Sequence, residues 1–208
     1  MAQRRIRDPE ARERIVTAAR EEVGARGLRG ATVRAIANRA GVSTGFVMHY
    51  FPDKPSLYRS VLEQNNRLAD ARVRAASDDQ RGNAAISAVV RALLPVDEER
   101  RLEWRVWSAF WAEAGKPSDE RDAGDDGLAA AFTGLVERLR SALEEAEADG
   151  EVAEGIDPRL EAERIVAMAA GLGLLAGVGP PGRLSARAEQ MVDAHLADLG
   201  RRAPQPAT

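Results

Sequence analysis

The sequence predicts an all-α protein with a small N-terminal helix-turn-helix domain and a larger C-terminal helical domain. Three observations support this fold class. Alanine, arginine, glutamate and leucine are abundant, whereas aromatic residues make up only 4% of the 208 residues. Apolar residues recur at helical spacing, and Gly, Pro, Ser, Thr or Asp stand where these segments begin and end. No segment shows the alternating pattern of a half-buried strand.

The chain begins with a basic arm, residues 1–8, followed by a predicted helix from Pro9 to about Ala25. Asp8 before Pro9 is a typical helix start, because proline needs no hydrogen bond to its nitrogen at the first helical position. Gly27 is expected to end this helix.

Residues 32–54 predict two short helices joined by a tight turn at Gly41. Thr32 is expected to cap the first helix, and Ser43 caps the second only two residues after Gly41. A turn that short makes the helices cross steeply, as in a helix-turn-helix, although any corner between two helices would show the same pattern.

The second of these helices has two different faces. Val47 and Phe51 point one way, with Tyr50 close to them. The other face is small and polar, which suits the major groove of DNA; it comprises Thr44, Gly45, Met48 and His49, with Phe46 on the flank.

Pro52 and Asp53 mark the start of a long connecting helix, residues 53–75, and so divide a domain 1–52 from a domain 53–208. Within the second domain, the same signals predict five further helices, over residues 83–94, 98–114, 128–149, 158–178 and 185–201. Asp97 is expected to cap the helix 98–114. Residues 115–127 and 179–182 are predicted loops, and residues 203–208 a disordered tail.

The charge is distributed unevenly along the chain, although its net value is only −3. Residues 1–60 carry 12 Lys and Arg against 6 Asp and Glu, whereas the rest carries 18 against 27. A basic head on an acidic body suggests that only the head meets a polyanion. The sequence has no cysteine and no apolar run long enough to span a membrane, so a cytoplasmic protein without membrane contact is expected.

The stretch 32–54, with the end of the helix before it, resembles the DNA-binding domain of TetR-family transcriptional regulators. The residues that carry the resemblance are Gly27, Leu28, Thr32, Ile36, Ala37, 40–43, Gly45, 49–51, Lys54 and Leu57. The family usually has tyrosine where this chain has Met48, which donates no hydrogen bond. The segment 46–51, Phe-Val-Met-His-Tyr-Phe, is most similar to the betaine-inhibitor (BetI) branch, and residues 94–114 are similar to the regulatory domain of that branch.

The resemblance implies a homodimeric regulator that binds a palindromic double-stranded DNA operator and is released from it by a small molecule. Such a regulator is expected to be a repressor. It implies a DNA-binding set of Thr32, Arg34, Ser43, Thr44, Gly45, Phe46, Met48, His49, Tyr50 and Lys54. Thr32 and Lys54 would hold phosphates, and Phe46 could touch a thymine methyl group. Two alternatives remain open: His49 could be an ordinary surface histidine, and Tyr50 could belong to the core.

Trp104, Trp107 and Trp111 lie on one stripe of the helix 98–114. They could form an aromatic wall that binds a choline-like or polyamine cation, or they could simply fill the core. Glu103, Glu113 and Asp97 could pair such a cation, or lie on a solvated face.

The last two helices are expected to form the dimer interface, as in the family. The predicted interface residues are Gly171, Leu172, Leu175, Met191, Val192, His195, Leu196 and Leu199. Small residues there could admit a neighbouring helix, or merely reflect fraying before Gly179.

No catalytic motif, phosphate-binding loop or metal-ligating cluster occurs in the sequence, so neither enzymatic activity nor a cofactor is expected. The alternative from another class is a helical small-molecule-binding or adaptor protein that does not touch DNA. Such a protein would show no salt-dependent binding to duplex DNA.

Overall fold

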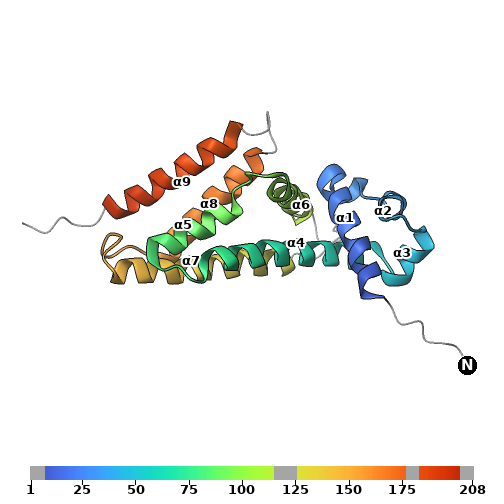
Figure 1. Cartoon of the computed structure of the whole chain (residues 1–208), viewed down its shortest axis with the longest axis horizontal. Coiled ribbons are helices and arrows are strands. Elements are labelled where there is room, and N and C mark those ends of the chain that lie inside the picture. The colour runs from blue at the N-terminus through green and yellow to red at the C-terminus, as the bar shows by residue number, and fades with distance from the viewer. Residues whose placement is uncertain (1–7, 115–125, 177–182, 202–208) are drawn as a thin grey trace, which may run out of the picture. The chain divides into compact units, whose positions relative to one another are not determined.

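The computed structural model describes residues 8–114, 126–176 and 183–201, and this part of the chain contains helices but no strand (Figure 1). The prediction of an all-α fold is therefore confirmed. The helices are α1 (Pro9–Gly30), α2 (Val33–Ala40), α3 (Thr44–Tyr50), α4 (Lys54–Ser77), α5 (Gly82–Leu93), α6 (Glu98–Ala114), α7 (Asp126–Ala148), α8 (Pro158–Ala176) and α9 (Arg183–Arg201). None of these helices, as far as the structure describes them, is long and apolar enough to cross a membrane.

The predicted starts of α1, α2, α3, α4 and α6 are confirmed by hydrogen bonds from the first turn of the helix to a side chain just before it. The accepting oxygens belong to Asp8, Thr32, Ser43, Asp53 and Asp97. The backbone N–H of Ser56 lowers the pKa of Asp53. Partial burial raises the pKa of Asp97, but the hydrogen bonds from Arg100 outweigh it and leave this pKa below its ordinary value. Each cap satisfies a backbone donor that the helix itself leaves unpaired.

The end of α1 differs from the prediction. The helix is interrupted at Gly27, where φ is 68° and ψ is 174°, and one further turn then reaches Gly30. The Tyr58 hydroxyl of α4 lies 2.5 Å from the carbonyl oxygen of Leu28 and 2.9 Å from that of Ala31. The hydroxyl of the fully buried Tyr58 is thus a hydrogen-bond donor to carbonyls that the end of α1 leaves without a helical partner.

Two other boundaries lie earlier than predicted. Helix α7 begins at Asp126 rather than at Leu128, and α9 begins at Arg183 rather than at Ser185. Polar residues are easily accommodated in a first helical turn. A helix start inferred from apolar periodicity alone is therefore placed too late in the chain. The predicted arm, the loop at 115–125, the loop at 179–182 and the tail at 203–208 fall on residues outside the described part.

The chain forms two compact units. The first comprises the described residues up to Arg67 together with the described residues between Arg105 and Leu128; the second comprises Leu68–Trp104 and the described residues from Ala129 onward. Helices α4 and α6 each contribute to both units. The first unit therefore extends beyond residues 1–52 and includes the first half of α4.

Each unit has its own apolar core. In the first unit the fully buried side chains include Ile15, Ile36, Val47 and Leu57. In the second they include Ile86, Leu139, Leu143 and Ile165. Phe132, Leu135 and Val136 of α7, which share the predicted core spacing with Leu139, are only half-buried. Within the second unit α9 packs on α5 and α8.

Candidate functional site

The turn between α2 and α3 has the predicted geometry. Gly41 has φ 68°, a left-handed conformation that glycine adopts without strain, and its N–H reaches back to the carbonyl of Asn38 at 3.2 Å. The N–H of Val42 donates to the carbonyl of Ala37 at 2.9 Å, and Ser43 then caps α3 through the N–H of Phe46 at 3.1 Å. The turn between the two helices is thereby held by hydrogen bonds on both of its sides.

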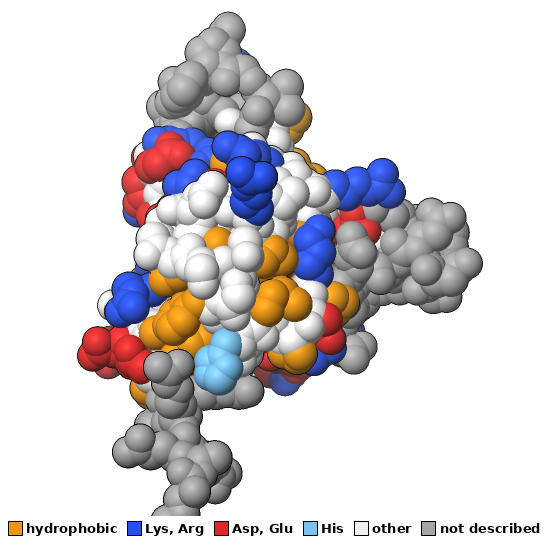
Figure 2. Space-filling view, turned by 90° about the vertical axis from the view of Figure 1, so that its right-hand side faces the viewer, with side chains coloured by type: hydrophobic (Ala, Val, Ile, Leu, Met, Phe, Trp, Pro, Cys, Tyr) orange, Lys and Arg blue, Asp and Glu red, His pale blue; other side chains and the backbone are white. Residues whose placement is uncertain are grey.

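Helix α3 buries one face and leaves the other exposed. Val47 is 0% and Tyr50 8% exposed, and Phe51, just after the helix, is also buried. The exposed residues of α3 are Thr44, Gly45, Phe46, Met48 and His49. The side of the molecule on which α2 and α3 lie shows hydrophobic surface next to a histidine (Figure 2).

Tyr50 belongs to the core, which is the alternative left open for it, so its place in the expected DNA-binding set is corrected. Its hydroxyl accepts a hydrogen bond from the backbone N–H of Asp8 at 3.1 Å. Its ring lies 5.3 Å from that of Phe46 and 5.4 Å, edge to face, from that of His49, measured between ring centroids. Tyr50 therefore supports both exposed rings from beneath, at distances where aromatic pairs attract.

Three cationic side chains near α3 differ in whether they are engaged within the chain. Arg34, in the first turn of α2, is exposed and forms no ion pair with any described residue. Arg39 donates to Glu22 at 2.7 Å and to Glu21 at 3.0 Å, and these hydrogen bonds raise its pKa. Lys54 lies over the ring of Tyr58, with 5.4 Å between the ammonium and the ring centroid. Arg34 is thus available to a partner, whereas Arg39 fastens α2 to α1.

Trp104 packs inside the second unit. It is 4% exposed, and its indole N–H donates to the carbonyl of Leu93 at 2.7 Å. A Cβ atom added to Gly173 of α8 would lie 2.0 Å from the Trp104 ring, so the ring rests against the bare backbone of that helix. For Trp104 the structure therefore supports core filling. It also explains Gly173, whose lack of a side chain serves a contact within this chain.

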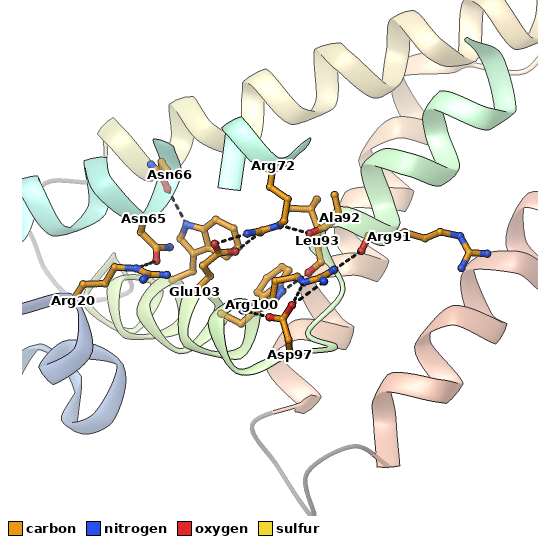
Figure 3. A network of polar contacts seen from close by, with 12 residues as sticks. Arg20, Asn65, Asn66, Arg72, Arg91, Ala92, Leu93, Asp97, Arg100 and Glu103 are labelled. Carbon is orange, nitrogen blue, oxygen red and sulfur yellow. Dashed lines mark hydrogen bonds and ion pairs between the residues drawn. The ribbon is translucent and has the colours of Figure 1, made fainter. Parts of the chain in front are cut away.

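Trp107 lies in the first unit, where it connects α6 to α4. It is 6% exposed, and its indole N–H donates to Asn66 Oδ1 at 2.8 Å; Asn66 Nδ2 donates in turn to the carbonyl of Gly127 at 2.9 Å. The preceding residue, Asn65, is 0% exposed and accepts a hydrogen bond from Arg20 Nε of α1 at 2.9 Å (Figure 3). Consecutive asparagines of α4 therefore bind α6 and α1. Trp111, the third residue of the stripe, is half-buried.

Glu103 is neutralised inside the second unit and does not lie on a solvated face. It is 1% exposed and forms a two-pronged ion pair with Arg72 of α4, in which Arg72 Nη1 donates to Glu103 Oε1 at 2.8 Å (Figure 3). Arg72 Nε also donates to the carbonyl of Ala92 at 2.8 Å. Of the two roles left open for Glu103, the structure excludes the solvated face, and the carboxylate pairs with Arg72 rather than with a ligand.

Sequence reasoning missed Arg72, Arg20 and the two asparagines. The asparagines gave a weak signal, because asparagine is a poor helix former and two adjacent ones in a long helix need a reason. The arginines gave none, since their partners lie 31 and 45 residues away in the chain.

The predicted dimer residues on α8 and α9 divide into buried and exposed sets. Leu172, Val192 and Leu199 are 3%, 0% and 2% exposed, because α9 packs on α5 and α8. These three cannot present a surface to a second copy, and their assignment to the interface is corrected. Leu175 and Met191 are large and exposed, as is Leu174, which was not predicted.

The remaining members of that set are half-buried: Gly171, His195 and Leu196. His195 Nε2 lies 2.8 Å from Oε1 of the buried Glu161, so the imidazole ring contacts a residue of its own unit. A Cβ atom at Gly171 would meet no other atom within 4 Å.

Comparison with known proteins finds two family matches along the chain. Residues 15–61 match the family of bacterial regulatory proteins of the tetR type, and residues 82–201 match the C-terminal domain of BetI-type transcriptional repressors. The transcriptional regulator PksA of Bacillus subtilis is 29% identical over 193 residues, which cover 90% of this chain and 89% of PksA. The regulator BetI of Paraburkholderia phytofirmans is 36% identical over 107 residues, and this match covers 50% of this chain and 54% of that protein. A transcriptional regulator from Saccharomonospora viridis, solved in complex with choline, superposes with a TM-score of 0.77 at 25% identity over 91% of this chain and 97% of its own.

Proposed function

This chain belongs to the TetR family of bacterial regulatory proteins, with a BetI-type C-terminal domain, and we propose that it acts as a homodimeric repressor whose operator is released by a small quaternary ammonium cation. Proteins of this family are DNA-binding transcriptional regulators with a ligand-binding C-terminal domain. The proposal names the residues, the effector class and the coupling in this chain.

The observation that carries the DNA-binding proposal is the exposed face of α3. Its residues stand on the buried Val47 and Tyr50, so this face is held rigidly outward. The unpaired Arg34 and the exposed Thr32 flank it at the start of α2, where a phosphate would find a cation, a hydroxyl and the positive end of a helix. In a dimer, two such faces would read half-sites about 34–36 Å apart, one turn of the duplex.

Replacing Arg34 tests the phosphate contact. The slope of log affinity against log salt concentration is negative. In Arg34→Ala its magnitude is expected to decrease by about 1 per subunit, because one counterion fewer is released. Affinity is measured by fluorescence anisotropy on a duplex selected from a random pool, between low and moderate salt. The control Arg187→Ala, which removes another exposed arginine, on α9, is expected to leave the slope unchanged. An unchanged slope in Arg34→Ala would remove Arg34 from the contact. If the wild-type chain retained no duplex at any salt concentration, the adaptor alternative would replace the regulator.

Trp107 and Trp111 support the effector proposal. Aromatic faces attract quaternary ammonium groups, and a protein of similar fold binds choline. Both residues lie on the part of α6 that belongs to the first unit. We assign Trp104 to packing, because both its N–H and its ring are engaged within the chain.

The hydrogen bond from Trp107 to Asn66 offers a route from effector to operator. An effector that displaces Trp107 would release Asn66, next to the Asn65 that holds Arg20 of α1. Coupling then follows if the cation binds more tightly to the state in which this hydrogen bond is broken.

The variant Trp107→Phe separates binding from release. It keeps an aromatic ring for the cation but removes the N–H donor to Asn66. Choline binding, measured by calorimetry, is expected to persist within about tenfold of wild type, since indole exceeds benzene in cation–π attraction by less than about 1.4 kcal/mol. The choline concentration that releases half of the operator should change more than the binding constant does. Equal changes in both quantities would contradict the coupling route, and an absence of binding by choline and by polyamines would contradict the cationic effector.

The exposed Leu174, Leu175 and Met191 support dimerisation through α8 and α9. Three large apolar side chains near each other in sequence or on packed helices are commonly covered by a partner. The narrowed interface proposal consists of these residues with Gly171 and Leu196.

A further inference from the structure

The exposed face of α3 has few groups that can read bases by hydrogen bonds. Of the exposed residues between Thr44 and His49, only these two carry a polar side-chain group. The side chains that read guanine and adenine through paired hydrogen bonds are Arg, Lys, Asn and Gln, and none of them occurs on α3. The base discrimination of this helix must therefore depend largely on something else.

Two large apolar side chains dominate that face instead. Phe46 is 36% and Met48 43% exposed, on a helix of seven residues. The rotation of 100° per residue places them on either side of Gly45 within the exposed arc. Phe46 is also braced by its ring contact with the buried Tyr50. An exposed yet braced apolar side chain is prepared for contact with an apolar group of a partner.

Gly45 indicates how closely that partner approaches. A Cβ atom added there would meet only Ser43 Oγ, at 3.9 Å, and the backbone has no positive φ. Nothing in the part of the chain that the structure describes therefore requires glycine at this position. Its absent side chain instead lets the backbone at Gly45, which lies between the Phe46 and Met48 side chains around the helix axis, approach a surface outside the chain.

We propose that Phe46 and Met48 recognise the 5-methyl groups of thymines in the major groove, so that the positions of thymine methyls, rather than hydrogen-bonded base edges, specify the centre of each half-site. This inference rests on the proposed DNA binding. The thymine methyl is the apolar group that the major groove displays, and apolar side chains discriminate it from the other bases by contact alone. Thr44, at one margin of the face, and His49, which the helical rotation places between Gly45 and Phe46, are then left to phosphates or to a neighbouring base.

The test removes methyl groups and nothing else. A duplex selected from a random pool is resynthesised with each thymine in turn replaced by deoxyuridine, which pairs identically but lacks the methyl group. At the contacted positions the wild-type affinity is expected to fall about fourfold per methyl, the effect of one buried carbon group. Where cytosine stands in place of a contacted thymine, the methyl contact is lost. Replacing that cytosine by 5-methylcytosine, which carries a methyl group at the same ring position, should restore the contact.

The side chains are assigned by combining base and protein changes. In Phe46→Ala, thymine and deoxyuridine should bind equally at the position read by Phe46, while the position read by Met48 stays sensitive; Met48→Ala should show the converse. Leu160→Ala, which trims another exposed apolar side chain, on α8, is the control and should keep both sensitivities. Circular dichroism verifies that each variant is folded.

The outcomes separate this inference from the proposed function. Selection of a duplex whose affinity is unaffected by every thymine-to-deoxyuridine replacement would overturn methyl recognition while leaving the regulator intact. Sensitivity that survives in both alanine variants would overturn the assignment to Phe46 and Met48. Failure to select any duplex would reject DNA binding itself.

Discussion

Removing the charge of Arg72 is expected to lower the free energy of unfolding by about 3 kcal/mol, because the buried Glu103 then loses its bidentate ion pair with Arg72. The substitution Arg72→Met keeps most of the aliphatic stem and so isolates the loss of the ion pair and of the hydrogen bond to Ala92. Urea denaturation followed by far-ultraviolet circular dichroism measures the change.

Arg74, two residues further along α4, provides the matched control. It pairs with Asp70 at 2.8 Å, but both side chains are more than half exposed. The substitution Arg74→Met is therefore expected to change stability by less than about 0.5 kcal/mol. In the double variant Arg72→Met with Glu103→Leu, most of the lost stability should return, because neither charge remains buried. Equal effects of the two single arginine substitutions would contradict the burial argument.

Adding a methyl group at Gly45 is expected to weaken operator binding about tenfold or more, while the stability of the fold stays the same or rises by up to about 1 kcal/mol. The Cβ atom has room within the chain but would stand between the backbone of α3 and the bases. Binding is measured by anisotropy and stability by thermal denaturation of Gly45→Ala.

Gly134 of α7 is the matched glycine. It is also exposed in a helix, and a Cβ atom there would meet nothing within 4 Å. Gly134→Ala should raise helix stability in the same way without altering operator affinity. If Gly45→Ala bound as tightly as wild type, α3 would not approach the groove at this residue.

The features that the sequence predicted well are those set by neighbours in the chain. Thr32, Ser43 and Asp97 cap the helices that follow them because a side-chain oxygen reaches an N–H only three residues away. The left-handed Gly41 is similarly local. Such rules also predicted which side of α3 is buried, since Val47 and Phe51 are separated by one helical turn.

The features that could not be predicted depend on which helices pack against each other. Glu103 carries the same charge as the exposed Glu98 and Glu99 before it. Its burial depends on an ion pair with Arg72, which comes from another helix. The apolar stripe of α9 fits an intermolecular contact as well as it fits packing on α5. Periodicity identifies an apolar face but not the surface that covers it, so Val192 and Leu199 were assigned to the wrong partner.

The contacts of α4 with α1 also bear on how such a regulator can be re-engineered. Tyr58 serves the carbonyls at the end of α1, Gln64 Nε2 donates to Glu13 and to Thr17, and Arg67 pairs with Glu13 at 2.7 Å. A chimera joined at residue 52 would separate α1 from all three of these α4 side chains. The residues that replaced them would come from a protein with a different DNA-binding domain. A junction placed after Arg67 transfers them together, so a transplanted operator specificity should be sought with that longer module.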